Sequence, residues 1–335
     1  WVLKSSLTAP ATEIHLDIDM DASASIIAHD SAYYGSAIFH IYGDIDTGSY
    51  TLNVGGVGTV YLHGSVGGSG SVAKFGNGTV YLQGTSGNTY TGSTTVEEGL
   101  LVLDKDSGNA VPGALIIGGN DATNPPATVR QEALSQIGTH VTINRMGTYD
   151  MNGYAETIND LNLNGGADID SASVTLSIRG DVSVGSGFSG ISGTLGLLSG
   201  DHYFDIDFWP IIFPQANCYL YADVTGAGNI IMTGGGILRM SGNNSYSGTT
   251  RVEDGSIEIE SETALGTTAG GTTVNAGSSL YLATSASSIP VGNEALALEG
   301  SIRSYGNSNS WTGDIVLSNN ASFSVQGIYL HLPGV

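Results

Sequence analysis

The sequence is poor in several residue types on which whole classes of protein depend. It has one cysteine, Cys218, in 335 residues, so no internal disulfide can form and stability must come from packing. Only 8 residues are proline and 12% are charged, which excludes a collagen-like chain and a charge-rich disordered one. No run of 18 apolar residues suggests a membrane helix. With 40% hydrophobic residues, we expect a packed interior and no membrane insertion.

Positive charge is scarce as well. The chain has 9 Lys and Arg against 31 Asp and Glu, which gives a net charge of −22. Such a field repels nucleic acid, anionic lipid and anionic polysaccharide, and it favours solubility or cation binding. We therefore expect no nucleic-acid partner. The first residue is Trp1 and no signal-like segment follows it, so we expect any targeting sequence to have been removed or to lie outside this sequence.

Glycine is the residue in excess, with 50 of 335 positions, about twice its average usage. Much of it recurs at fixed places in two segments, 68–103 and 226–259. In the first segment the frame consists of Gly70, Lys74, Gly78 and Gly84, and in the second it consists of Gly228, Met232, Gly236 and Gly242. Self-similarity of this kind is the signature of a repeat architecture, so we predict two copies of one structural module.

Within each copy the apolar residues alternate with polar ones. They are Val80, Leu82, Leu101 and Leu103 in the first copy and Leu238, Met240, Ile257 and Ile259 in the second. A period of two over short runs is typical of strands with one face inward. Equivalent strands lie about 20 residues apart, which is the length of one turn of a three-sided parallel β-solenoid. The sequence predicts an all-β fold, a single continuous β-solenoid over residues 1–335 with roughly 16 turns.

The two segments resemble the passenger-associated transport repeat (autotransporter-associated β-strand repeat) of bacterial autotransporter passengers. Residues 68–103 carry its G-x-G-x-V-x-K-x-G-x-G-x-V-x-L-x-G opening and its Tyr-x-Gly-x-Thr-x-Val continuation. The copy at 226–259 has Met232 where the lysine is usual, and residues 147–169 are more weakly similar to a further family segment. The resemblance implies a right-handed parallel β-helix, secreted and displayed at the cell surface, in proteins that are often adhesins or structural fibres. The chain has no protease or lipase motif, so no particular activity carries over.

Residues 201–221 depart from this pattern. They concentrate aromatic side chains in a chain that is only 8% aromatic. The aromatic residues singled out in this segment are Phe204, Phe208, Trp209 and Phe213. One interpretation is an irregular loop or cap folded onto the solenoid. The other is an exposed apolar patch, in which these four residues bind a glycan or a host surface protein.

Acidic residues recur at alternate positions, as in Asp17, Asp19 and Asp21. Residues i and i+2 of a strand share one face, so stacked turns could gather carboxylate oxygens for Ca²⁺. The other interpretation is a solvated outer face, with Leu16, Ile18 and Met20 pointing inward. Because the glycine-rich nonapeptide of calcium-binding repeats is missing, the sequence leaves both interpretations open, with these three aspartates as the candidate Ca²⁺ ligands.

Paired carboxylates could also be the acid and base of a β-helical carbohydrate-active enzyme, a glycoside hydrolase or lyase. Against this, the sequence shows no local cluster that combines paired acids with His and Arg or Lys, and a net charge of −22 suits a uronate substrate poorly. Nucleophile and metal motifs are missing too. We expect a non-enzymatic, extracellular bacterial protein that acts as a surface structural element. An adhesin is the alternative and an enzyme the second alternative.

The ends of a solenoid expose strands that lack a partner, and proteins normally cap or pair such edges. Neither end of this sequence carries a clear polar cap. The first residues, 1–7, are largely apolar, and residues 322–335 end in strand-like alternation. We therefore expect copies to associate end to end, or by exchange of terminal strands, into a filament or surface layer.

Overall fold

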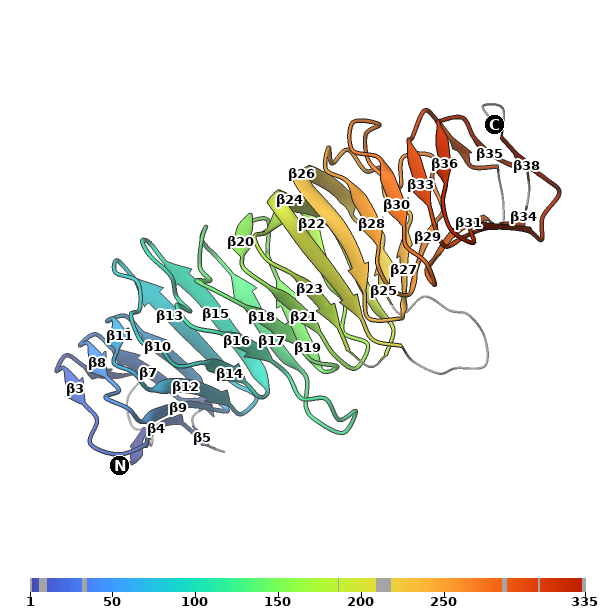
Figure 1. Ribbon diagram of the computed structural model, residues 1–335. Helices are drawn as coiled ribbons and strands as arrows, with labels where there is room; N and C mark the ends of the chain where they lie inside the picture. The colour runs from blue at the N-terminus through green and yellow to red at the C-terminus, as the bar shows by residue number, and fades with distance from the viewer. Residues whose placement is uncertain are drawn as a thin grey trace. The chain divides into compact units, whose positions relative to one another are not determined.

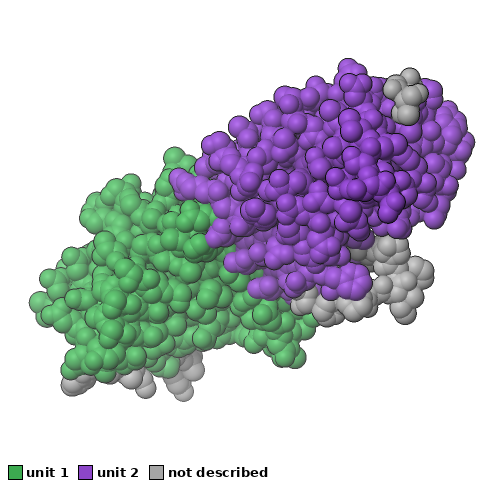
Figure 2. Space-filling view, viewed as in Figure 1, with its two compact units in different colours: residues 1–159 green, residues 160–335 purple. Residues whose placement is uncertain are grey.

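The computed structural model describes residues 2–5, 11–31, 35–185, 187–208, 218–284, 288–306 and 308–332. This part of the chain is all β. Since it contains no helix, it also contains none that is long and apolar enough to cross a membrane. The chain divides into two compact units, Trp1–Asn159 and Asp160–Val335, which Figure 2 shows in different colours.

Unit 1 is built from strands that pair in parallel with the strand one turn later (Figure 1). One sheet contains β2 (Thr12–Ile14), β7 (Ile38–Ile41), β10 (Thr59–Leu62), β13 (Thr79–Gly84), β15 (Gly99–Lys105), β17 (Ala127–Gln131) and β19 (Gly147–Asp150). A second series contains β1 (Val2–Ser5), β4 (Ala24–Ala28), β9 (Thr51–Gly56), β12 (Ser71–Phe75), β14 (Thr94–Val96), β16 (Leu115–Ile117) and β18 (Val141–Ile143). The third side is formed by β3 (Ile18–Asp19), β8 (Ile45–Asp46) and β11 (Val66–Gly67). A short antiparallel hairpin, β5 (Asp30–Ser31) and β6 (Gly35–Ser36), and strand β20 (Glu156–Ile158) complete the unit.

Unit 2 repeats the same plan. It begins with β21 (Leu161–Leu163), β22 (Ile169–Ile178), β23 (Val182–Val184) and the long β24 (Ser189–Ile206). One series then contains β25 (Cys218–Leu220), β27 (Ile237–Met240), β29 (Ser256–Ile259), β31 (Ser279–Thr284), β34 (Ser301–Gly306) and β37 (Ser322–Val325). The alternate series contains β26 (Asp223–Thr233), β28 (Thr250–Val252), β30 (Thr272–Val274), β33 (Leu296–Leu298) and β36 (Ile315–Leu317). The third side at the end of the unit contains β32 (Pro290–Val291), β35 (Asn309–Trp311) and β38 (Leu330–His331).

The core of each unit is made by the alternating apolar residues of these strands. The residues predicted to point inward are Val80, Leu82, Leu101, Leu103, Leu238, Met240, Ile257 and Ile259, and all of them are fully buried. Like residues lie above one another, as in the pairs Val80 over Val60 and Leu82 over Leu62. Stacking of this kind in parallel register buries both the apolar side chains and the backbone hydrogen bonds of each turn.

The parallel β-solenoid predicted from the sequence is confirmed, but the turns are longer than expected. The structure has about 13 turns, so the predicted count of roughly 16 is approximately right but somewhat high. The reason is that some turns contain inserted loops. Leu101 of β15 lies opposite Val129 of β17, a turn of 28 residues, because an exposed loop around residues 120–126 is inserted there.

The irregular segment predicted at residues 201–221 is shorter than expected. Residues 201–206 are the end of strand β24, which pairs in parallel with β23 and β26, and residues 218–220 form β25. Successive residues of this segment point alternately outward and inward, with His202, Phe204 and Ile206 buried. Residues 209–217 lie outside the described part of the chain.

Candidate functional site

The predicted aromatic binding residues are not all on the surface. Phe204 is completely buried in β24, where it lies opposite Val182 and Met232, so its side chain cannot contact a partner. Phe208 is 67% exposed and stays a candidate binding residue. Trp209 and Phe213 lie outside the described residues.

The three aspartates predicted as Ca²⁺ ligands are exposed on the first turn of unit 1. Asp17 already has a role in the backbone structure, because its Oδ1 accepts a hydrogen bond of 2.8 Å from the amide of Asp44 one turn later. Asp19 lies opposite Asp46, whose carboxylate accepts from the Gly48 amide. In the part of the chain that the structure describes, no group of three or more His, Cys, Asp or Glu is arranged to hold a metal ion. Calcium binding by Asp17, Asp19 and Asp21 stays a prediction.

A face of unit 2 gathers aromatic, basic and acidic side chains that are far apart in the sequence. They belong to the series from β25 to β34, whose register places one residue of each strand above the next. The resulting column consists of Tyr219, Arg239, Glu258, Tyr281 and Arg303. These residues alternate with the buried ones of the same strands, so their side chains point away from the core.

Arg239 is the electrostatic centre of this face. Its Nη2 lies 3.0 Å from Glu258 Oε1, and its Nη1 lies 3.5 Å from Glu260 Oε1. Its guanidinium also lies 5.1 Å from the centre of the Tyr219 ring. Burial raises the pKa of the Glu258 carboxyl, and the neighbouring Arg239 acts against this effect by favouring the charged form. One arginine thus faces two carboxylates, so this group of three side chains carries an excess of negative charge.

Next to this ion pair the surface is hollowed. A hollow of about 230 Å³ is lined by Ile237, Glu258, Tyr281, Ala283 and Tyr305. The rings of Tyr281 and Tyr305 are 5.8 Å apart and tilted by 34°, so they do not cover each other. We call this feature the Tyr281 groove. Beside it, the exposed guanidinium of Arg303 lies 5.5 Å from the centre of the Tyr281 ring.

The equivalent face of unit 1 carries a closed ladder of rings on β7, β10 and β13 and on the residues directly after β2, β7 and β10. Its members are His15, His40, Tyr42, Tyr61, His63 and Tyr81. The rings form two columns, one of His15, Tyr42 and His63 and the other of His40, Tyr61 and Tyr81. Within each column the centres of neighbouring rings are 4.2 to 4.5 Å apart. Between the columns, His40 Nδ1 shares a hydrogen bond of 2.9 Å with His63 Nε2. Burial lowers the pKa of His63, and His40 and Lys105 lower it further. The rings of the ladder thus cover one another's faces.

Buried polar side chains tie successive turns together at equivalent places in the two repeat copies. Asn88 accepts from the Val66 amide at 2.9 Å and donates to the Ala110 carbonyl at 2.7 Å, so that it bridges three turns. Asn244 makes the same two bonds, to Val224 and Ala264. The hydroxyls of Tyr90 and Tyr246 bond to Thr94 and Thr250 respectively.

Asn88→Ala is expected to destabilise the protein by about 2 to 4 kcal/mol, because the Val66 amide and the Ala110 carbonyl would stay buried without a partner. Urea unfolding followed by circular dichroism measures the effect. Asn120→Ala, which changes an exposed asparagine of the same unit, is the control and should cost less than about 0.5 kcal/mol. Equal effects of the two substitutions would show that the bridge between turns contributes nothing.

Sequence reasoning missed the arginine and glutamate cluster for a simple reason. Arg239 and Glu258 are 19 residues apart, and Tyr281 is a further 23 residues along, so no local window contains them. The signal that could have found the cluster is the number of residues in each turn, because it determines which side chains lie above one another. Once the registers of β27, β29 and β31 are known, the outward residue of each strand identifies its neighbour in the next.

Comparison with known proteins supports the repeat assignment. The passenger-associated-transport-repeat matches the chain twice, at residues 72–103 and 230–259. No curated protein and no solved structure matches the chain. Proteins that carry this repeat are typically secreted or surface-exposed bacterial proteins with structural or adhesive roles. The chain therefore carries two copies of the repeat found in autotransporter passengers, within a parallel β-solenoid.

Proposed function

We propose that this protein is a secreted structural element of the bacterial surface whose solenoid turns stack end to end with those of further copies. The observations that support the proposal are an apolar hollow at the first described turn of unit 1 and exposed apolar side chains at core positions of the last described turn of unit 2. Buried apolar surface is the main source of stability in such stacks, so an uncovered turn favours association with another turn.

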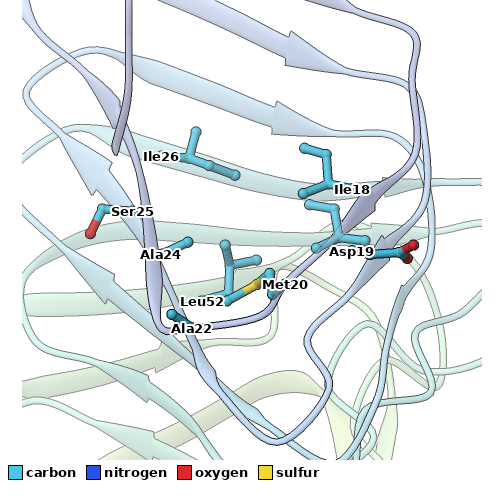
Figure 3. A pocket seen from close by; sticks show the side chains of 9 residues that line it. Ile18, Asp19, Met20, Ala22, Ala24, Ser25, Ile26 and Leu52 are labelled. Carbon is cyan, nitrogen blue, oxygen red and sulfur yellow. The ribbon is translucent and has the colours of Figure 1, made fainter. Parts of the chain in front are cut away.

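In the first turn of unit 1, the interior opens into a hollow of about 300 Å³. Figure 3 shows Ile18, Met20, Ile26 and Leu52 around this hollow. Ile26 and Leu52 belong to the strand series that forms the core in the following turns. The hollow therefore adjoins the apolar interior of the solenoid.

In the last turn of unit 2, residues at core positions are exposed. Leu317 lies over the buried Leu298 and Phe323 lies over the buried Ile302, yet the two side chains are 50% and 38% exposed. Val325 lies over the buried Ser304 and is 46% exposed. We call Leu317, Phe323 and Val325 the end-face residues. Their side chains occupy the positions that point into the core in the preceding turns, but no following turn of the described chain packs against them.

The backbone at these two turns is also available for pairing. Among the described residues, β3 of the first turn pairs on one side only, with β8, and β36, β37 and β38 of the last turn pair only with β33, β34 and β35. A parallel strand edge with free amide and carbonyl groups is a template for another strand. A second copy would supply both the strands and the apolar side chains.

Electron microscopy of the purified protein over a concentration series, with and without Ca²⁺, should show filaments that lengthen as concentration rises. Leu317→Asp should abolish them, because a carboxylate at a core position of the junction would be buried without a partner. Val316→Asp is the matched control, since Val316 is the outward neighbour on β36, is 62% exposed, and should tolerate the charge. A protein that stays monomeric at every concentration would contradict the proposal.

A second function, adhesion, is favoured by the outward face of unit 2. This face presents Tyr219, Tyr281 and Tyr305 beside charged side chains, and aromatic residues with polar groups at their edge are typical of binding surfaces. Adhesion does not compete with assembly, because the face lies along the turns and the end-face residues lie on the last one.

A further inference from the structure

We propose that the Tyr281 groove binds a neutral oligosaccharide. The inference rests on the second proposed function, adhesion, and gives it a site and a class of ligand. The groove is formed by residues of four consecutive strands: Ile237 of β27, Glu258 of β29, Tyr281 and Ala283 of β31, and Tyr305 of β34.

The shape of the groove suits a linear ligand that lies across the strands. Neighbouring strands of a sheet are about 4.8 Å apart, so a groove from β27 to β34 crosses three such spacings, about 14 Å. Ala283 lies opposite Tyr305, and its small side chain leaves the space beside the two tyrosine rings open. In the ring ladder of unit 1, by contrast, the rings stack at 4.2 to 4.5 Å and no ligand can lie between them.

The chemistry of the lining matches a sugar ring. A pyranose has apolar C–H groups on its faces and hydroxyl groups around its edge. The tilted rings of Tyr281 and Tyr305 offer apolar faces, and their hydroxyls can both donate and accept hydrogen bonds. The Glu258 carboxylate accepts from hydroxyl donors, and the exposed Arg303 beside the groove donates to hydroxyl oxygens.

The charges favour a neutral ligand over an acidic one. Arg239, which lies beside the groove on β27, is already paired with Glu258 and Glu260. A uronate or sialic acid would bring a carboxylate close to two glutamates, in a chain of net charge −22. Arg303 alone would have to offset that repulsion.

The backbone of the face argues against a peptide as the occupant. An extended peptide is usually recognised by adding its own strand to a free sheet edge. Strands β29 and β31 are paired on both sides along the groove, with β27, with each other and with β34. Recognition here must come from side chains, which a sugar with many hydroxyl groups can use fully.

Isothermal titration of the full chain with maltotetraose, cellotetraose and lacto-N-tetraose as neutral probes, and sialyllactose and trigalacturonate as acidic probes, tests the inference. We expect at least one neutral probe to bind. Tyr281→Ala should weaken that binding about tenfold or more, as loss of an aromatic anchor does. Ala283→Gln, which fills the groove from the surface and removes no ring, should weaken it as well. Tyr50→Ala, at an exposed tyrosine of unit 1, is the control and should leave binding unchanged.

Three results would overturn the inference: binding of acidic probes alone, binding of no probe, or neutral binding that both Tyr281→Ala and Ala283→Gln leave intact. In the last case the chain still binds glycans, so adhesion stands and only the site is wrong. If no probe binds and the protein also fails to adhere to bacterial or host cell surfaces, adhesion fails with it. None of these binding results bears on end-to-end assembly, which the Leu317→Asp variant tests separately.

Discussion

Gly70→Ala is expected to destabilise the protein by about 3 kcal/mol or more. The backbone of Gly70 lies directly against the preceding turn. A Cβ at this position would overlap the carbonyl oxygen of Tyr50 and would approach Thr47 Oγ1 to 2.8 Å. Because the obstacle is backbone, it cannot rotate away, and the two turns would have to separate.

The contact is a repeated device rather than a single crowded place. A Cβ on Gly92 would meet the carbonyl of Gly70, and a Cβ on Gly113 would meet the carbonyl of Gly92. A Cβ on Gly248 of the second repeat copy would meet the carbonyl of Gly228, and a Cβ on Gly270 of the following turn would meet the carbonyl of Gly248. A column of glycines therefore lets each corner sit on the backbone of the corner before it.

The measurement is the free energy of unfolding in urea, with Gly292→Ala as the control. Gly292 has no atom within 4 Å of the position that a Cβ would take, so this substitution should change stability by less than about 1 kcal/mol. If Gly70→Ala and Gly292→Ala have the same effect, close approach of the turns is not the reason for glycine at the corner.

The strands could be predicted from the sequence because the repeat displays its period twice. Alternation at Val80 and Leu82, and again at Leu238 and Met240, indicates inward faces with no need for knowledge of their neighbours. The pairing of turns was harder to predict, since the exposed loop at residues 120–126 lengthens one turn and shifts every register after it.

The turn before the last one of unit 2 shows how far a motif can change while its contacts persist. Asn309 accepts from the Ile289 amide at 2.9 Å, as Asn88 accepts from Val66. Two residues later, Trp311 takes the place of the repeat tyrosine, and its Nε1 donates to the Glu294 carbonyl at 2.7 Å. The order Asn, aromatic, Gly at 309, 311 and 313 is the remaining signal, and it was too short to be recognised beside the two full copies.

The predicted aromatic patch failed at Phe204 for the same reason that the acidic and basic cluster went unseen. Composition identifies a segment as unusual but does not say which way each side chain points. The alternation of "HYFDI" places Phe204 inward with His202 and Ile206, and that alternation is a better guide to burial than the density of aromatic residues around it.

Stability is expected to rise between pH 7 and pH 9, because two buried lysines lose protons more easily in the folded protein than in the unfolded chain. Lys74 Nζ donates to the backbone carbonyls of Phe75, Gly76 and Glu98, and Lys105 Nζ donates to those of Gly64 and Gln83. Burial lowers the pKa of Lys74 to about 8, with Glu98 acting against the shift, and burial lowers that of Lys105 to about 8 against the effect of Asp44.

The sign follows from proton counting. Above pH 8 the folded protein has begun to release these protons, whereas the unfolded chain holds them up to about 10.5, so the unfolded state binds more protons and stability rises with pH. The gain from pH 7 to pH 9 is about 1 kcal/mol for each lysine. Burial raises the pKa of Cys218 to about 12 and that of Tyr90 still higher, so the trend reverses above this window as the unfolded thiol and phenols ionise.

The decisive comparison is the pH dependence of the variants. Met232 occupies the position of Lys74 in the second repeat copy and is fully buried, so Lys74→Met places in the first copy a residue that the same fold already accepts. Thermal unfolding at pH 7, 8 and 9 should show about half the rise in Lys74→Met and almost none in Lys74→Met with Lys105→Met. If the double variant shows the same rise in stability as the unsubstituted protein, the two lysines are not its cause. In that case the surrounding carbonyls keep the pKa of both lysines at its ordinary value in the folded protein.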